Sequence, residues 1–76
     1  MVGAEEPHPP LKRIVVNGEP IETAAHNLVE LITTLGYGEA KVATALNGAF
    51  VPERTRAATT LNHADRVEIL APRQGG

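Results

Sequence analysis

Two Asn-Gly dipeptides, at positions 17–18 and 47–48, constrain the fold of this chain more than any other feature of its sequence. Asn-Gly favours a two-residue β-hairpin turn, because both residues accept the positive φ angles that the turn requires. Strand-forming residues flank each dipeptide, so the sequence predicts two β-hairpins. Pro20 cannot donate a hydrogen bond to a neighbouring strand, which places the second strand at a sheet edge. The four predicted strands span residues 12–16, 19–22, 42–46 and 49–51.

One amphipathic helix is predicted between the two hairpins. Its apolar residues recur at positions i, i+3, i+4 and i+7, which gives a single apolar stripe. Asn27 is a suitable N-cap, and Glu30 three residues later completes a pattern that resembles a capping box. Gly36 is placed for the C-cap, with Tyr37 positioned to contact the last turn. The stripe consists of Leu28, Leu31, Ile32 and Leu35.

A fifth strand is predicted at 66–70, after a turn at 62–65, whereas residues 53–60 are polar and should be irregular apart from a short helical turn. A single apolar helix stripe must be buried against the strands. We therefore expect an α+β fold, in which one main helix packs on one face of a mixed four- to five-stranded sheet. The expected core comprises Ile14, Val16, Leu28, Leu31, Ile32, Leu35, Val42, Leu46, Leu61, Val67 and Ile69.

The chain divides into three predicted segments. Residues 1–10 contain three prolines in four positions and little to bury, which is typical of a disordered arm. Residues 11–70 form the folded domain. Residues 71–76 form a flexible tail, because Pro72 limits strand pairing and the last two residues are glycines.

Composition excludes several kinds of site. The chain has no cysteine, so it has neither a disulfide nor a thiol nucleophile. His8, His26 and His63 are scattered and match no metal-ligand spacing, and we expect neither a metal nor a permanently bound cofactor. A net charge of −2 and two aromatic residues do not indicate nucleic-acid binding. Short apolar runs give no signal peptide or membrane segment, and we expect a cytoplasmic protein.

The C-terminal residues Gly75 and Gly76 suggest where chemistry takes place. Glycine has no Cβ and permits close approach of another molecule. An extended tail of this kind can enter a narrow enzyme channel and present the Gly76 carboxylate for reaction. Because the chain has no thiol, any sulfur that it carries must be attached to another group, and the terminal carboxylate is the obvious one.

Other polar residues have structural explanations. Asp65 and Glu68 resemble an acid–base pair, but charges on a turn and on the outer face of a strand are usually structural. Arg54 and Arg56 could contact a partner protein, but we interpret them as solvated loop charges. A docking patch on the sheet face opposite the helix is predicted from apolar residues that have no place in the core. These residues are Val15, Ala43, Ala45, Phe50 and Leu70.

From about residue 11 to residue 76, the sequence resembles the ThiS family of sulfur carriers, which have the ubiquitin-like β-grasp fold. The resemblance is carried by VNGE at 16–19, by VATALNG at 42–48 continuing into FVP, and by DRVEI at 65–69. Two positions depart from the family pattern. Ala64 stands where the family usually has glycine, which affects the local turn, and Glu53 intervenes between Val-Pro and the basic Arg54.

This resemblance implies a role as a protein co-substrate and not as an enzyme. A ThiF-type activating enzyme would use ATP to adenylate Gly76, and sulfur from a persulfide donor protein would convert the carboxylate to a thiocarboxylate. A ThiG-type synthase would then receive the sulfur for the thiazole of thiamine. Three alternatives stay open at this point: a carrier for another pathway, such as MoaD-like molybdopterin synthesis, a ubiquitin-like protein modifier, and a binding module with an accidental Gly-Gly end.

Overall fold

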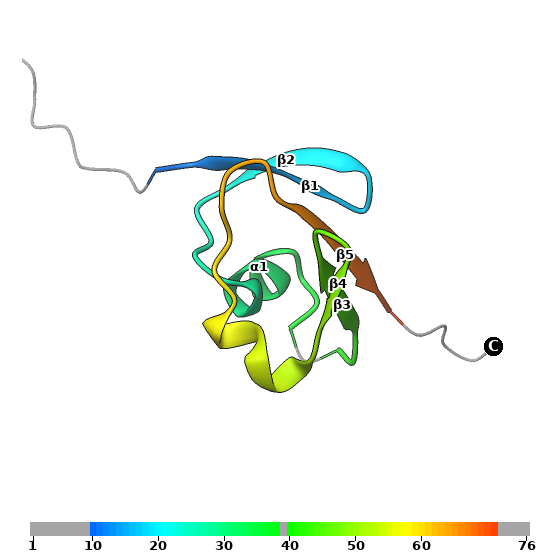
Figure 1. Ribbon diagram of the computed structural model, residues 1–76. Helices are drawn as coiled ribbons and strands as arrows, with labels where there is room; N and C mark the ends of the chain where they lie inside the picture. Colours follow the sequence, from blue (N-terminus) through cyan, green and yellow to red (C-terminus); the bar gives the residue numbers. More distant parts are fainter. Residues whose placement is uncertain (1–9, 39, 72–76) are drawn as a thin grey trace, which may run out of the picture.

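The computed structural model describes residues 10–38 and 40–71 (Figure 1). A single sheet is built from two hairpins and a last strand. The strands are β1 (Lys12–Val16), β2 (Glu19–Thr23), β3 (Ala43–Leu46), β4 (Ala49–Val51) and β5 (Arg66–Leu70). Helix α1 (Leu28–Thr34) lies between the hairpins in sequence, and the 3₁₀-helix η1 (Glu53–Ala58) lies between β4 and β5. The element order agrees with the sequence prediction, except that residues 53–58 form a regular 3₁₀-helix.

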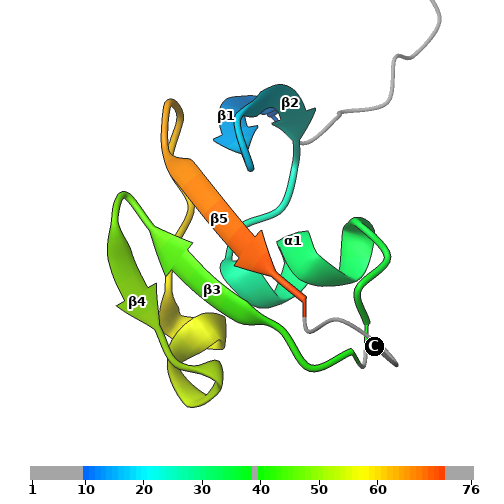
Figure 2. The same cartoon turned by 90° about the vertical axis from the view of Figure 1, so that its right-hand side faces the viewer.

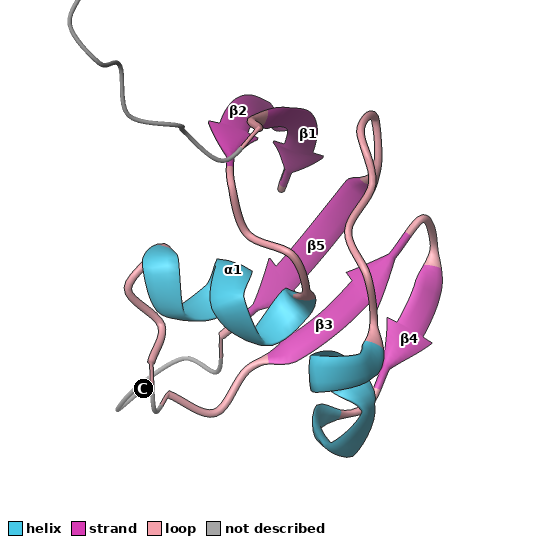
Figure 3. Ribbon diagram, turned by 90° about the vertical axis from the view of Figure 1, so that its left-hand side faces the viewer, coloured by secondary structure: helices cyan, strands magenta, loops and turns pink. Residues whose placement is uncertain are grey.

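The sheet has the order β2-β1-β5-β3-β4, so the last strand of the chain occupies its centre. Strand β1 pairs with β5 in parallel, whereas β3 pairs with β5 antiparallel. Helices α1 and η1 lie on the same side of the sheet (Figure 3). The prediction of a mixed sheet covered by one main helix is confirmed, and β2, which contains Pro20, is an edge strand as expected.

Both Asn-Gly turns have the conformation that the sequence predicts. The φ angles are +51° and +86° at Asn17 and Gly18, and +52° and +86° at Asn47 and Gly48. Each turn asparagine also bonds to β5. The Asn17 side chain accepts a hydrogen bond from the Ile69 amide at 2.8 Å and donates one to the Ile69 carbonyl at 3.1 Å. The parallel pairing of β1 with β5 is thereby continued by a side-chain amide.

Asn47 makes the corresponding contacts at the other end of β5. Its side chain accepts a hydrogen bond from the Arg66 amide at 2.9 Å and donates one to Asp65 Oδ1 at 3.0 Å. Its backbone amide donates to the Arg66 carbonyl at 2.7 Å. The two hairpins are therefore attached to the central strand by their turns as well as by their strands.

Helix α1 begins and ends as predicted, with one shift. Asn27 Oδ1 accepts a hydrogen bond from the Glu30 amide at 2.9 Å. Glu30 Oε1 accepts from the His26 amide at 2.8 Å, one residue before the N-cap, so the reciprocal bond differs from that of a capping box. This hydrogen bond lowers the pKa of the Glu30 carboxyl below its usual value. Gly36, at φ +93°, ends the helix, with the Tyr37 amide bonded to the Ile32 carbonyl at 2.9 Å.

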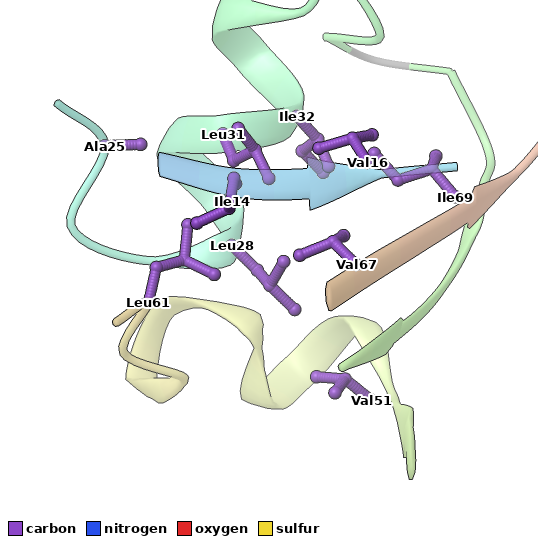
Figure 4. Close-up of a cluster of buried hydrophobic side chains, with 10 residues drawn as sticks. All are labelled: Ile14, Val16, Ala25, Leu28, Leu31, Ile32, Val51, Leu61, Val67 and Ile69. Carbon is purple, nitrogen blue, oxygen red and sulfur yellow. The ribbon is translucent and has the colours of Figure 1, made fainter. Parts of the chain in front are cut away.

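A cluster of buried aliphatic side chains fills the space between α1 and the sheet (Figure 4). The prediction that Leu35 belongs to the core is wrong, since this side chain is 38% exposed. Leu35 is the C-cap residue, where the backbone leaves the helical path, and Tyr37 packs against the core. Val42 and Leu46 are only partly buried. The buried members are Ile14, Val16, Ala25, Leu28, Leu31, Ile32, Val51, Leu61, Val67 and Ile69, of which Ala25 and Val51 were not predicted.

Substitution of Asn17 by glycine tests the attachment of β1 to β5. Glycine retains the positive φ but removes both side-chain hydrogen bonds to Ile69. At about 0.5–1.5 kcal/mol for each bond, Asn17→Gly should lower the free energy of unfolding by about 1–3 kcal/mol. Urea denaturation measures the change. The exposed Asn62 is a matched control, and a loss in Asn17→Gly no larger than that in Asn62→Gly would contradict the assignment.

Ala64 has the left-handed conformation, with φ +76°, in the turn that leads into β5. This conformation costs an L-residue roughly 1–2 kcal/mol, whereas glycine adopts it freely. Because glycine also raises the entropy of the unfolded chain, we expect Ala64→Gly to stabilise the protein by about 0.5–1 kcal/mol. Thermal denaturation measures the effect. The same substitution at Ala58, which lacks a positive φ, should destabilise, and equal effects at the two positions would disprove the explanation.

Candidate functional site

The described chain ends at Ala71, one residue beyond the central strand β5. The predicted reactive residues Gly75 and Gly76 lie outside the described residues, so their role stays a prediction. The end of β5 is bordered by the beginning of β3, because Leu70 pairs with Ala43. A partner that binds the tail would therefore also meet this corner of the sheet, which Figure 2 shows from the side away from α1.

The sheet face opposite α1 carries the predicted docking patch. Ala45 pairs with Phe50 on one side and with Glu68 on the other, and Ala43 pairs with Leu70. These residues alternate with the buried Thr44, Val51 and Ile69, so they point away from the core. Phe50 and Leu70 are each 69% exposed, which is unusual for large apolar side chains.

The structure brings four of the five predicted patch residues together and separates the fifth. Val15 lies on β1, where it pairs with Arg66 of β5 and with Pro20 of β2. Strand β5 stands between β1 and β3, and its outward residues Arg66 and Glu68 carry charges. We therefore define the apolar face as Ala43, Ala45, Phe50 and Leu70.

Asp65 has a structural role in the loop before β5. Its carboxylate accepts hydrogen bonds from the Asn62 amide at 2.8 Å and from Asn47 Nδ2 at 3.0 Å. These bonds connect the loop to the second hairpin turn. Glu68 is exposed on the open face of β5 beside Ala45. The structural interpretation of Asp65 is confirmed.

The interpretation of Arg56 as a solvated loop charge is wrong, because this residue is only 6% exposed. Its Nε donates to Thr44 Oγ1 at 2.9 Å, and its Nη2 donates to the Val42 carbonyl at 2.6 Å. Arg54, two residues earlier, is exposed as expected. Nothing in the polar run 53–60 distinguishes the two arginines. Their different environments follow from how η1 packs beside β3.

The described part of the chain provides neither a metal site nor a membrane-spanning helix. Residues 10–38 and 40–71 contain no group of three or more His, Cys, Asp or Glu side chains placed to bind a metal ion. Within these same ranges, no helix has the length and hydropathy needed to cross a bilayer. The tail exit and the apolar face thus form the candidate site.

Comparison with known proteins identifies the family. The family model described as "ThiS family" matches residues 13–76, a range that includes the terminal Gly75 and Gly76. The chain belongs to the ThiS family. No curated protein matches the chain. The crystal structure of a thiamine biosynthesis protein (ThiS) from Geobacter metallireducens is similar, with 32% sequence identity and a TM-score of 0.71. The similarity covers 84% of this chain and 99% of the Geobacter chain.

Membership in the ThiS family confirms the resemblance inferred from the Asn-Gly motifs and the Gly-Gly end. The similar Geobacter structure agrees with the ubiquitin-like β-grasp assignment. Together they support a sulfur carrier role in thiamine biosynthesis. ThiS proteins are small sulfur carriers and generally not enzymes.

Proposed function

We propose that this ThiS-family protein carries sulfur as a thiocarboxylate on Gly76 and delivers it for synthesis of the thiamine thiazole. The observation that supports this most is the family match, which extends through the terminal Gly75 and Gly76. The absence of cysteine from the sequence agrees with it, since the chain has no thiol that could hold the sulfur as a persulfide.

The proposed chemistry needs an activated carboxylate, because oxide is a poor leaving group. A Gly76 carboxylate oxygen would attack the α-phosphorus of ATP, and pyrophosphate would leave. The terminal sulfur of a persulfide donor protein would then attack the carbonyl carbon, and AMP would leave with the bonding electrons. A second thiol would attack the donor protein's sulfur in the resulting acyl disulfide and form a disulfide with it, and the thiocarboxylate would leave with the bonding electrons. ATP serves as a substrate of the activating enzyme, and we propose that the reaction takes place in the cytoplasm.

The proposed partners would use the two parts of the candidate site together. A ThiF-type activating enzyme would bind the apolar face while the tail enters its active site. The apolar face adjoins the end of β5 through the pair Ala43 and Leu70, so one continuous surface leads to the tail. A ThiG-type synthase would bind the same end of the molecule when it receives the sulfur. The two enzymes would therefore compete for the carrier.

Substitution on the apolar face tests the docking of the activating enzyme. Ala43→Asp introduces a carboxylate at an exposed position opposite Leu70. Burying this unpaired charge in an interface should weaken binding about tenfold or more. Titration calorimetry measures the affinity. The matched control is Ala57→Asp on η1, which is exposed away from the face. Equal affinity of Ala43→Asp and the wild type would remove this docking surface.

Changes to the last residue test the site of chemistry. Deleting Gly76 moves the terminal carboxylate back by about 3.3–3.6 Å, the length of one extended residue. Adenylation should be abolished by the deletion and reduced about 100-fold by Gly76→Ala, because small errors in placing a reacting group are costly. The assay is ATP–pyrophosphate exchange, with intact mass to detect the thiocarboxylate. Gln74→Ala is the control on the tail, and wild-type exchange by the deletion would contradict the carrier function.

A further inference from the structure

A groove of about 510 Å³ lies beside the apolar face, between α1, η1 and the segment that enters β3. Figure 3 shows α1 and η1 on the same side of β3. Residues of both helices and of the segment that enters β3 line the groove. Apolar atoms come from Ile32, Val42 and Pro52, and charged groups come from Lys41, Glu53 and Arg56. Among the described residues of the lining, two side chains are positively charged and one is negatively charged.

Arg56 is the unusual member of this lining. A guanidinium stays charged at any physiological pH, and burying a charge is costly unless it is paired. The ion pairs between described residues join Arg13 to Glu22 and His26 to Glu30, and neither includes Arg56. The hydrogen bonds of the described residues engage its Nε and Nη2, with Thr44 and the Val42 carbonyl. A guanidinium has five N–H donors, so it retains capacity for a carboxylate.

The groove is continuous with the apolar face. Ala43 and Phe50 belong to both surfaces, and Ala43 also pairs with Leu70 at the end of β5. A protein that binds the apolar face therefore contacts two residues that also line the groove. The rim residue Lys41 is exposed and lies two positions before β3, where it can meet the same partner.

We propose that this groove receives an acidic side chain of the ThiF-type activating enzyme, an aspartate or glutamate flanked by an apolar residue. Arg56 binds the carboxylate from the wall of the groove, and Lys41 attracts it from the rim. The apolar neighbour contacts Val42 and Pro52. This inference rests on the proposed function for the identity of the partner. According to this inference, the charged groove beside the apolar face determines which partner the carrier binds.

Graded charge changes at Lys41 test the groove without disturbing the core. Lys41→Gln and Lys41→Glu should weaken binding to the activating enzyme progressively, with about a tenfold loss for the reversal, and should reduce the salt dependence of the affinity. The matched controls are Arg54→Gln and Arg54→Glu, which change the net charge equally at an exposed position outside the groove lining. These controls should change the affinity less than about twofold. Titration calorimetry at low and high ionic strength provides both readouts.

Three results would overturn the proposal, and they are distinguishable. Equal losses of affinity in the Lys41 and Arg54 variants would mean that binding depends only on the overall charge of the carrier. If Lys41→Glu binds the activating enzyme with the affinity and salt dependence of the wild type, the groove lies outside the interface. In that case the carrier function still stands, provided that the wild-type chain binds the enzyme and supports ATP–pyrophosphate exchange. Absence of binding and of exchange with the wild-type chain would overturn the carrier function together with this inference.

Discussion

The pairing of β1 with β5 is the constraint on which the rest of the structure depends. This pairing joins the first strand of the domain to the last, and its parallel register comprises only Val15 with Arg66 and Val16 with Val67. The backbone amide of Asn17 then donates to the Val67 carbonyl at 2.9 Å, and the Asn17 side chain bonds both polar backbone groups of Ile69. A side-chain amide thus continues the ladder past the point where the backbone turns away. Without the Asn17 side chain, β5 would be attached to the first hairpin mainly by the two register pairs of β1 with β5.

The central position of β5 determines where the chain leaves the sheet towards its C-terminus. One face of the strand buries Val67 and Ile69 against α1, and the other face presents Glu68 and Leu70. Strand β5 pairs with β1 on one side and with β3 on the other, immediately before the tail begins. A partner that binds the tail has a defined surface next to it, because the register with β3 places Ala43 beside Leu70. In this fold the core therefore positions the site without contributing a reactive group to it.

Arg56 connects the fold to recognition in a different way. Its guanidinium joins η1 to β3 through Thr44, whose hydroxyl in turn donates to the Val51 carbonyl at 2.8 Å. These polar bonds lie at the margin of an otherwise aliphatic cluster. A buried cation in this position stabilises the packing of η1 only while its donors are satisfied. The remaining N–H groups of this guanidinium are the basis for proposing that the adjoining groove binds a carboxylate.

The sequence by itself determined the features of this protein that depend on local conformation. The Asn-Gly turns, the N-cap at Asn27 and the end of the helix at Gly36 could be predicted because each depends on the φ angles and hydrogen bonds of a few neighbouring residues. The terminal glycines predict a reactive end from residue type alone, and this stays a prediction. Only the tertiary structure decided that Leu35 is exposed, that Arg56 is buried and that Val15 is separated from the apolar face. These outcomes depend on strand register and on which element packs against which. Both bring together residues that are far apart in the chain, such as Asn17 and Ile69, which are 52 positions apart and hydrogen-bonded.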